Sequence, residues 1–401
     1  MKLHHHLVIE VIDALKEIFA EKRQADKVIE RHMKANKKWG ARDRKFFAEG
    51  VYEITRWWRL HWSQAGLPAD DYNNPDMMTD ENVCKVWGAW WLSRGQELPN
   101  WDELEGLVFN NSKKFPPEIQ QSVPSWLYKL GEEQFQSEWK GILHALNQPA
   151  KVFLRTNRLK TNREALLTEL MSEGVEGKAV EGLDDAIELM ERKNVFITQS
   201  FKKGLFEVQD AASQMVAPLL EIEPGQRVID ACAGGGGKTL HMASLMKNKG
   251  KILALDIHDW KLKELKTRAA RGGVDIVETR HIDSTKVIKR MEETADRLLL
   301  DVPCSGLGVL RRNPDSKWKL SMEEIERLIK LQQEIIQTYS KMVKKGGKMV
   351  YATCSILPLE NQNQVQKFLE SNPDWKLEQE IILRPDHEGY DGFYAARLLR
   401  A

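Results

Sequence analysis

The sequence predicts an α/β fold with a mostly parallel sheet, preceded by an all-helical domain and a small α+β linking module. Strand and helix patterns alternate over residues 209–401, which is typical of a parallel sheet with crossover helices. A glycine-rich turn follows the first of these strands directly. Residues 7–147 show helical periodicity instead and hold ten of the thirteen tryptophans, which indicates a separate domain.

The composition is that of an ordinary globular protein. The 401 residues suit two or three domains, and 42% hydrophobic residues allow normal cores. Apolar runs stay well below the roughly 20 residues of a membrane span. With no secretory signal evident, we expect a cytoplasmic protein. Four cysteines in so long a chain favour a reducing compartment over a disulfide framework. The net charge of +1 does not by itself point to nucleic acid.

The helical domain is predicted to span residues 1–147. Apolar residues recur at helical spacing over Val8–Phe19, and the pattern continues over Ala25–His32 and Arg42–Trp58. Packing into a helical core is the favoured interpretation of the tryptophans, with stacking on bases as the alternative. The ten are Trp39, Trp57, Trp58, Trp62, Trp87, Trp90, Trp91, Trp101, Trp126 and Trp139.

Two features of this domain leave alternatives open. The basic stretches Lys34–Lys38 and Arg42–Lys45 could contact phosphate or form a plain solvated face. The run His4–His6 could suggest a metal site, but a flexible terminus or a cloning remnant is the favoured interpretation. Since no Cys/His spacing elsewhere supports zinc, we expect no metal.

Residues 150–208 are predicted to form the linking module. A strand is expected over Lys151–Asn157, a helix over Asn162–Ser172, and strands within Val195–Val208 around Gly204. A basic cluster lies directly before the catalytic half and is a candidate contact for an RNA backbone, with a solvated face as the alternative. It comprises Arg155, Arg158, Lys160 and Arg163.

The remaining residues, 209–401, are predicted to form the catalytic domain. The clearest helical pattern covers Ser321–Val343. Seven strands are expected, at Arg227–Ala231, Lys251–Asp256, Ile276–Thr279, Arg297–Val302, Lys348–Thr353, Trp375–Leu383 and Tyr394–Leu399.

The first of these strands leads into the glycine loop, Asp230–Thr239, where a ligand can approach the backbone closely. Two nucleotide-binding patterns fail here. A phosphate-binding P-loop requires glycine where Cys232 stands. A G-x-G-x-x-G run would require a third glycine at Thr239 or Leu240.

Acidic residues follow the next two strands. Asp256 suits the hydroxyls of a ribose, and Asp283 could reach an adenine. Each acidic residue alone is weak evidence for a nucleoside site, since such residues often cap helices. Together with the glycine loop they favour a nucleoside bound without a demanding phosphate site, which fits S-adenosylmethionine.

Two further strand ends carry cysteines. Arg297–Leu310 places Asp301 and Cys304 just past a buried apolar run, and Lys348–Ser355 does the same for Cys354. Because the carboxyl ends of parallel strands meet at one sheet edge, we expect these side chains to lie near one another. A carboxylate beside thiols offers a proton donor or acceptor next to a nucleophile. Two small buried thiols are the alternative.

These motifs together resemble the Fmu/Sun family of RNA cytosine-5 methyltransferases. The resemblance covers residues 150–401, and the paired D-x-P-C and T-C-S motifs are highly specific. The stretch Ala25–Trp58, with Gly40–Arg44, resembles more weakly a NusB-like helical domain. The glycine loop departs from the family, which usually has Ala-Pro where Gly234 and Gly235 stand. The segments that carry the resemblance are Gln209–Gln214, Asp230–Thr239, Asp301–Gly306, and Ala352–Ser355 with Glu360 and Asn361.

The resemblance implies a Rossmann-like domain that uses S-adenosylmethionine to methylate cytidine C5 in RNA. It assigns Cys354 as the nucleophile that adds to C6, Cys304 to product release, Asp301 to the ring, and Lys238 to a place near the cytidine. The residues alone do not decide which cysteine attacks, because DNA cytosine-5 enzymes use the one in the Pro-Cys position. The expected cofactor-binding residues are Cys232, Ala233, Gly234, Gly235, Gly236, Gly237, Lys238, Asp256, Asp283 and Asp301.

The expected substrate is 16S ribosomal RNA. The enzyme is expected to be a monomer. The target base must be unstacked, which favours a loop or partly assembled RNA. Transfer RNA is the alternative substrate. A non-catalytic RNA-binding assembly factor with the same fold is the alternative from another class, although the presence of both thiols, Asp301 and Lys238 argues against it.

Overall fold

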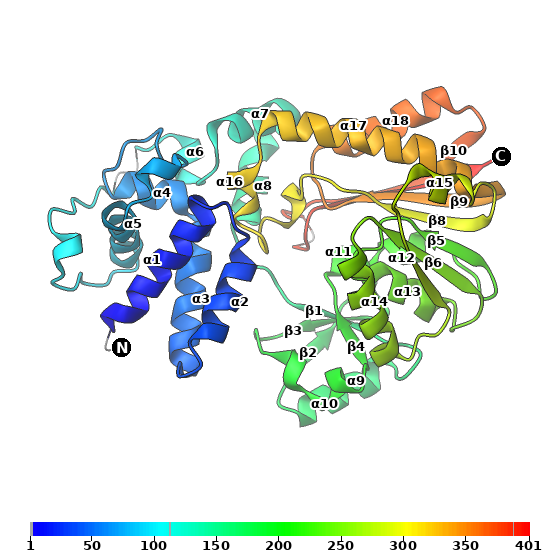
Figure 1. Ribbon diagram of the computed structural model, residues 1–401, viewed down its shortest axis with the longest axis horizontal. Helices are drawn as coiled ribbons and strands as arrows, with labels where there is room; N and C mark the ends of the chain where they lie inside the picture. Colours follow the sequence, from blue (N-terminus) through cyan, green and yellow to red (C-terminus); the bar gives the residue numbers. More distant parts are fainter. Residues whose placement is uncertain (1–2, 112–113, 388) are drawn as a thin grey trace. The chain divides into compact units, whose positions relative to one another are not determined.

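The computed structural model describes residues 3–111, 114–387 and 389–401. The chain forms two compact units, shown in Figure 1. A helical unit comprises Met1–Gln148 with Leu310–Met322, and an α/β unit comprises Pro149–Val309 with Glu323–Ala401. In the described residues, every helix is too short or too polar to cross a lipid bilayer.

The helical unit is built around α1, whose apolar side chains Val8, Val11 and Leu15 are fully buried. Its helices are α1 His5–Phe19, α2 Ala25–Ala35, α3 Ala41–Arg56, α4 Trp58–Gln64, α5 Asp80–Ser93, α6 Pro117–Gln120, α7 Ser125–Phe135 and α8 Trp139–Leu146. The predicted tryptophan core is confirmed, because Trp58, Trp62, Trp87 and Trp139 are buried and none of the ten is exposed. His5 lies within α1, where its ring packs edge-on against Trp101, so the expected flexible terminus does not include it.

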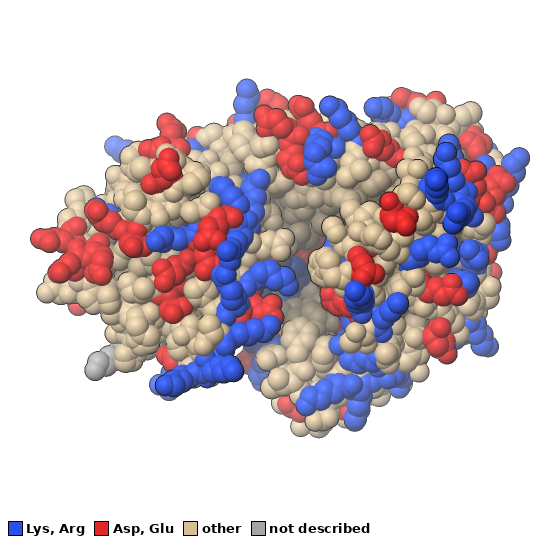
Figure 2. Space-filling view, viewed as in Figure 1, with Lys and Arg blue, Asp and Glu red and all other residues tan. Residues whose placement is uncertain are grey.

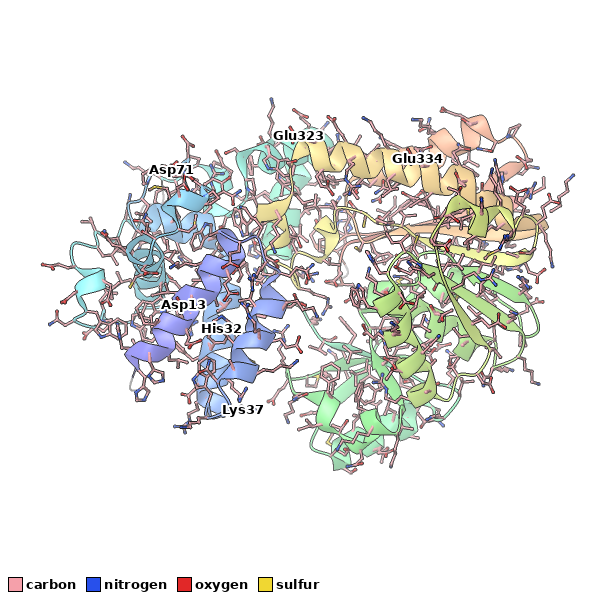
Figure 3. All side chains as sticks on the ribbon, viewed as in Figure 1. Asp13, His32, Lys37, Asp71, Glu323 and Glu334 are labelled. Atoms are coloured by element: carbon pink, nitrogen blue, oxygen red, sulfur yellow. The ribbon has the colours of Figure 1, made fainter. Side chains whose placement is uncertain are left out.

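One surface of this unit is strongly basic. Figure 2 shows Lys and Arg side chains gathered over α2 and α3. Lys34, Lys37, Lys38, Arg42 and Lys45 are all exposed there. Figure 3 places Lys37 at the turn between the two helices.

The other side of α2 packs against α1 through a charged contact. His32, labelled in Figure 3, lies between two carboxylates, with Nδ1 at 2.7 Å from Glu10 and Nε2 at 3.0 Å from Glu17. This contact turns His32 inward, so the basic residues of α2 and α3 are left facing solvent.

Residues 310–322, expected within the catalytic domain, pack with the helical unit instead. Within this segment, α16 spans Ser316–Lys319. The indole of Trp318 is 3% exposed and donates to the carbonyl of Thr55 at 2.7 Å. The ammonium of Lys317 donates to the carbonyl of Arg56 at 2.8 Å, and burial lowers the pKa of Lys317. Removing residues 1–148 would therefore strip these buried groups of their partners.

The α/β unit begins with a small antiparallel sheet of order β2-β3-β1-β4. Of the strands predicted around Gly204 within Val195–Val208, only β4, after Gly204, is confirmed; the stretch before Gly204 forms a 3₁₀ turn and then α10. The hydroxyl of Thr198 caps α10 by accepting from the amide of Phe201, which ends the extended pattern locally. The elements are β1 Phe153–Thr156, α9 Arg163–Ser172, β2 Gly177–Ala179, β3 Ala186–Leu189, α10 Gln199–Lys202 and β4 Phe206–Val208.

The main sheet has seven strands in the order β10-β11-β9-β8-β5-β6-β7. All seven predicted strands are confirmed, and β9 starts five residues earlier than predicted. Strands β9, β8, β5, β6 and β7 are parallel, whereas β11 runs antiparallel to β9 and to β10. The strands are β5 Arg227–Asp230, β6 Lys251–Asp256, β7 Val277–His281, β8 Ala295–Asp301, β9 Val343–Thr353, β10 Trp375–Leu383 and β11 Phe393–Arg400.

Helices cover both faces of this sheet (Figure 1). Alternate residues of β8 point to opposite faces, so Leu298 and Leu300 pack in one core while Leu299 packs in the other. The first core includes α17 Met322–Tyr339 and α18 Gln362–Ser371. The second includes α12 Val216–Leu219 and α13 Gly237–Leu245, and α14 Asp259–Gly272 packs with Leu240 of α13 in a small adjoining cluster. The result is a three-layer doubly wound fold.

Candidate active site

The candidate residues gather at the carboxyl edge of the parallel strands. In the β8–β9 register Asp301 lies beside Ala352, so the loops after both strands leave the sheet together. Asp230, at the end of β5, lies beside Leu299 of β8. This register brings the glycine loop and both cysteine loops to one edge, as expected for a fold of this kind.

The two cysteines are adjacent. Their Sγ atoms lie 3.4 Å apart, and either thiol can donate to the other sulfur. The hydrogen bond to Cys354, together with burial, raises the pKa of Cys304 well above its usual range. Cys304 therefore stays a protonated thiol facing the sulfur of Cys354.

A buried carboxylate holds the two cysteine loops in place. Glu360 is fully buried, and it accepts from the amide of Ser305 at 2.8 Å and from Gln332 Nε2 at 3.0 Å. The hydroxyl of Ser305 also donates to Glu360, and it lies 3.2 Å from the hydroxyl of Ser355. Since each serine follows one of the cysteines, this network fixes their relative positions. The sequence motifs included Glu360, but Gln332, on α17, carried no signal that linked it to the site.

Gly308 allows the close approach of these loops. Its amide donates to the carbonyl of Cys354 at 3.0 Å. A Cβ at this position would lie 2.8 Å from that carbonyl oxygen and 2.0 Å from the carbonyl oxygen of Gly392. Any side chain here would push the two loops apart.

Lys238 and Asp301 form an ion pair beside the cysteines. The ammonium lies 2.7 Å from the carboxylate, with side chains 12% and 30% exposed. The ammonium also lies over the ring of Phe393, 4.9 Å from its centroid. Burial acts to lower the pKa of Lys238, but the attraction of Asp301 outweighs it and raises the pKa. Lys238 therefore remains charged, and its charge is close enough to interact with Cys354.

The glycine loop adopts a conformation that requires glycine. Gly236 has φ +85°, and a Cβ there would lie 2.5 Å from Cγ of Leu265 on α14. Gly237 then begins α13. A Cβ at Gly234 would meet no atom of the described chain within 4 Å, so the loop borders open space at this edge.

Asp256 is tied directly to this loop. Its carboxylate is 7% exposed and accepts from the amides of Gly234 at 2.9 Å and His258 at 2.8 Å. The amide of Ala233 in turn donates to the carbonyl of Leu255 at 2.9 Å, which joins the loop to β6.

The remaining predicted residues, Cys232 and Asp283, have different surroundings. Burial raises the pKa of Cys232 well above its usual range, so this thiol stays protonated. Asp283 is exposed beyond β7, and it accepts from the hydroxyl of Ser284 at 3.0 Å.

The four basic residues of the linking module differ in their exposure. Arg155 is 2% exposed and bonds to Gln209 and to the carbonyl of Gly237. Lys160 and Arg163 donate to backbone carbonyls, and Arg158 pairs with Asp185. Arg155 is therefore unavailable to an RNA backbone, whereas Arg158 and Lys160 keep exposed side chains, and an RNA contact by these two stays a prediction.

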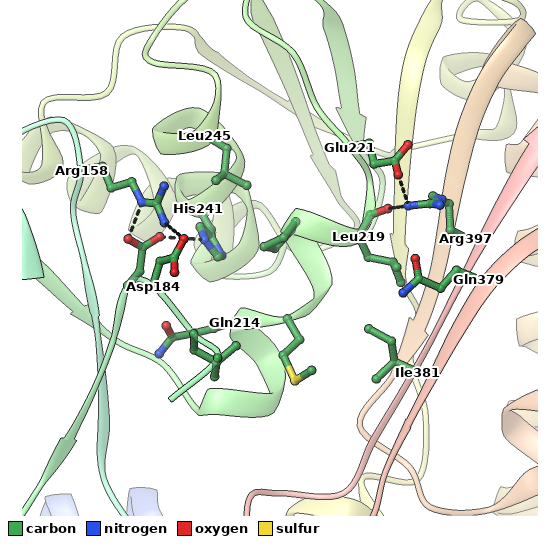
Figure 4. A pocket seen from close by; sticks show the side chains of 15 residues that line it. Arg158, Asp184, Gln214, Leu219, Glu221, His241, Leu245, Gln379, Ile381 and Arg397 are labelled. Carbon is green, nitrogen blue, oxygen red and sulfur yellow. Dashed lines mark hydrogen bonds and ion pairs between the residues drawn. The ribbon is translucent and has the colours of Figure 1, made fainter. Parts of the chain in front are cut away.

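A separate cavity of about 500 Å³ opens on the α/β unit. Figure 4 shows Arg158, Asp184 and His241 on one wall and the Arg397–Glu221 ion pair on the other. Burial lowers the pKa of His241 to about 4, so its ring is neutral. Arg158 and Gln214 of this lining belong to segments singled out in the sequence, and His241 lies one turn after Lys238 on α13, but no lining residue is among the predicted catalytic or cofactor-binding residues.

A three-layer doubly wound sheet, with a glycine loop and acidic strand ends at one edge, defines a Rossmann-like methyltransferase domain. Residues 217–399 match the family described as 16S rRNA methyltransferase RsmB/F, and residues 123–196 match its RsmF/B-like ferredoxin-like domain.

Individual relatives agree with this match. The chain is 36% identical over 319 residues to the probable ribosomal RNA small subunit methyltransferase B of Synechocystis, covering 75% of this chain and 71% of that protein. It is 38% identical over 288 residues to ribosomal RNA small subunit methyltransferase B of Pectobacterium atrosepticum, covering 69% of this chain and 66% of that protein.

Two solved structures share the fold. PH0851 superposes with a TM-score of 0.84 at 26% identity over the whole of both chains. A methyltransferase homolog protein from Pyrococcus horikoshii gives a TM-score of 0.64 at 26% identity, covering 71% of this chain and 98% of that one. The chain therefore belongs to the RsmB/F family of 16S rRNA methyltransferases, which confirms the resemblance drawn from its motifs, and it is an RNA methyltransferase.

Proposed function

We propose that this enzyme methylates C5 of a cytidine in RNA, with S-adenosylmethionine as the methyl donor and 16S ribosomal RNA as the substrate. The observation that carries the proposal is the pair of thiols 3.4 Å apart beside the Lys238–Asp301 ion pair. Methylation of an exocyclic amine would not require two cysteines. The names of the relatives support ribosomal RNA as the substrate.

The residues at the glycine loop fit the proposed cofactor. The loop borders open space at Gly234, and Asp256 lies beside it with a carboxylate that already accepts two amides. A carboxylate oxygen has more than one acceptor site, so Asp256 can also accept from ribose hydroxyls. Bound there, S-adenosylmethionine would supply an electrophilic methyl group.

The chemistry explains why thiols are needed. Cytosine C5 is a poor nucleophile, and addition of a thiolate to C6 makes it enamine-like. After C5 has taken the methyl group, the C5 proton must leave and the thiolate must be eliminated from C6, which restores the aromatic ring. Asp301 is suited to hold a proton at N3 while the adduct forms.

We assign Cys354 as the attacking thiol and Cys304 to its release. Cys304 is kept protonated by burial and by its contact with Cys354. A thiolate on Cys354 would therefore face a thiol donor on one side and interact with the Lys238 ammonium, both of which stabilise it. The buried network around Glu360 keeps this geometry rigid.

The helical unit is proposed to aid RNA recognition. Its exposed lysines and arginines on α2 and α3 form a surface suited to a phosphate backbone (Figure 2). The tryptophans of this unit are largely used in its core, which leaves charge rather than stacking as the means of contact.

Bisulfite sequencing of total RNA, with and without the protein, tests the proposed reaction. We expect a cytidine in 16S ribosomal RNA that resists conversion only when the protein is present. Resistance confined to transfer RNA would make transfer RNA the substrate and would leave the proposed C5 methylation unchanged. No change in any RNA would favour a non-catalytic assembly factor.

A further inference from the structure

Two arginines hold the glycine loop from outside the main sheet. Arg268, on α14, donates from Nη1 to the carbonyl of Gly235 at 2.7 Å. Arg155, on β1 of the small sheet, donates from Nη1 to the carbonyl of Gly237 at 2.6 Å. The two bonds flank Gly236, the residue with left-handed φ.

Each arginine is itself fixed by a residue on β4 of the small sheet or directly after it. Glu207, on β4, accepts from Nε and Nη2 of Arg268 at 3.2 and 3.0 Å, and it also pairs with Arg271. Gln209, just after β4, accepts from Arg155. The small sheet, with the residue directly after β4, therefore contributes one arginine and both of the anchoring side chains.

The burial of Arg155 is costly for a purely structural contact. Its guanidinium bonds to two neutral oxygens, and burial lowers its pKa to about 10 although the charge of Glu207 opposes this. A neutral residue of similar size would fill the space at lower cost. The arginine instead reaches a carbonyl of the proposed cofactor loop.

The loop needs such support because it has little stiffness of its own. Four consecutive glycines, Gly234–Gly237, leave the backbone with more conformational freedom than any other run of four residues. In this chain, glycines also replace the Ala-Pro that is usual in the family. Hydrogen bonds from outside can supply the order that the loop sequence does not.

We propose that Arg155 and Arg268 are positioning residues that hold the glycine loop in its cofactor-binding conformation, which makes the small α+β module a part of the cofactor site. The inference rests on the proposed binding of S-adenosylmethionine at this loop. It predicts that loosening either bond weakens cofactor binding while leaving the reacting groups intact.

The test compares Arg155→Met and Arg268→Met with the parent. In the cofactor-free protein, hydrogen exchange of the amides of residues 233–238 should be about tenfold faster in each variant, since a charge-assisted bond is lost. Calorimetry with S-adenosylmethionine should show about tenfold weaker binding. The KM for the cofactor should rise accordingly, with kcat at saturating cofactor within about threefold. Arg268→Lys should recover part of the binding, because an ammonium can still reach one of the two partners.

Lys160→Met is the matched control. The Lys160 ammonium donates to the carbonyls of Lys203 and Arg271, both at 2.7 Å, so it joins the same module to the end of α14 rather than to the loop. This variant should bind cofactor and exchange loop amides like the parent. Parental binding and exchange in folded Arg155→Met and Arg268→Met would overturn the inference, as would equal effects in Lys160→Met. Absence of cofactor binding by the parent would instead contradict the proposed function.

Discussion

Asp230 makes the stability of the α/β unit depend on pH. Its carboxyl ends β5, is 1% exposed, and accepts from the hydroxyl of Thr239 at 2.7 Å. Burial raises the pKa of Asp230 from 3.8 to about 7. Because this pKa is higher in the folded chain than in the unfolded chain, folding favours the protonated form. The contribution of Asp230 to stability is therefore lost progressively as the pH rises from about 4 to about 7.

The substitution Asp230→Asn removes the ionisation and keeps the shape. The difference between 3.8 and about 7 corresponds to ~4 kcal/mol. Relative to the parent, the free energy of unfolding of the variant should therefore increase by a few kcal/mol between pH 4 and pH 8. Urea unfolding of both proteins across this range measures the difference.

Asp283→Asn, the same exchange at an exposed position beyond β7, serves as the control for the effect of the substitution itself. A constant difference between Asp230→Asn and the parent would refute the reasoning, because it would mean that Asp230 ionises alike in the folded and unfolded chains.

Two further predictions concern the ligands. Asp256→Ala removes the acceptor for two loop amides and for the proposed ribose contact, so calorimetry should show binding of S-adenosylmethionine weakened by about 1.5–3 kcal/mol; equal affinity would argue against the assignment. The double substitution Lys37→Glu with Lys38→Glu should weaken binding of structured RNA and reduce its dependence on salt, whereas Lys249→Glu, exposed on the α/β unit, should do less. Equal binding by all three proteins in filter assays at several salt concentrations would exclude the surface of α2 and α3.

The strand ends could be predicted from the sequence because their signals are local. Each buried strand is a short apolar run closed by turn residues, and the parallel arrangement follows from the alternation with helices. Once the strands are parallel, Asp301 and Cys354 must leave the sheet at the same edge. This reasoning anticipated that the two cysteine loops would be neighbours.

The contacts of the small module could not be predicted in this way. Arg155 and Gly237 are separated by 82 positions, and the bond between them depends on how two sheets pack. From sequence alone, Arg155 is indistinguishable from a solvated arginine, so its burial could not be predicted. The short strands β2 and β3 and the segment around Trp318 share this difficulty, since distant partners decide their structure.

The formation of a covalent protein–RNA adduct tests the central claim most directly. In the presence of S-adenosylmethionine and RNA, Cys304→Ala should form the bond to C6 but stall at its elimination, which gives a slowly migrating band on a denaturing gel. Cys354→Ala should give no such band, and the double variant should behave like Cys354→Ala. A band that appears with Cys354→Ala and vanishes with Cys304→Ala would contradict the assigned roles. If neither variant gave a band and both lost similar stability, the two cysteines would have only a structural role.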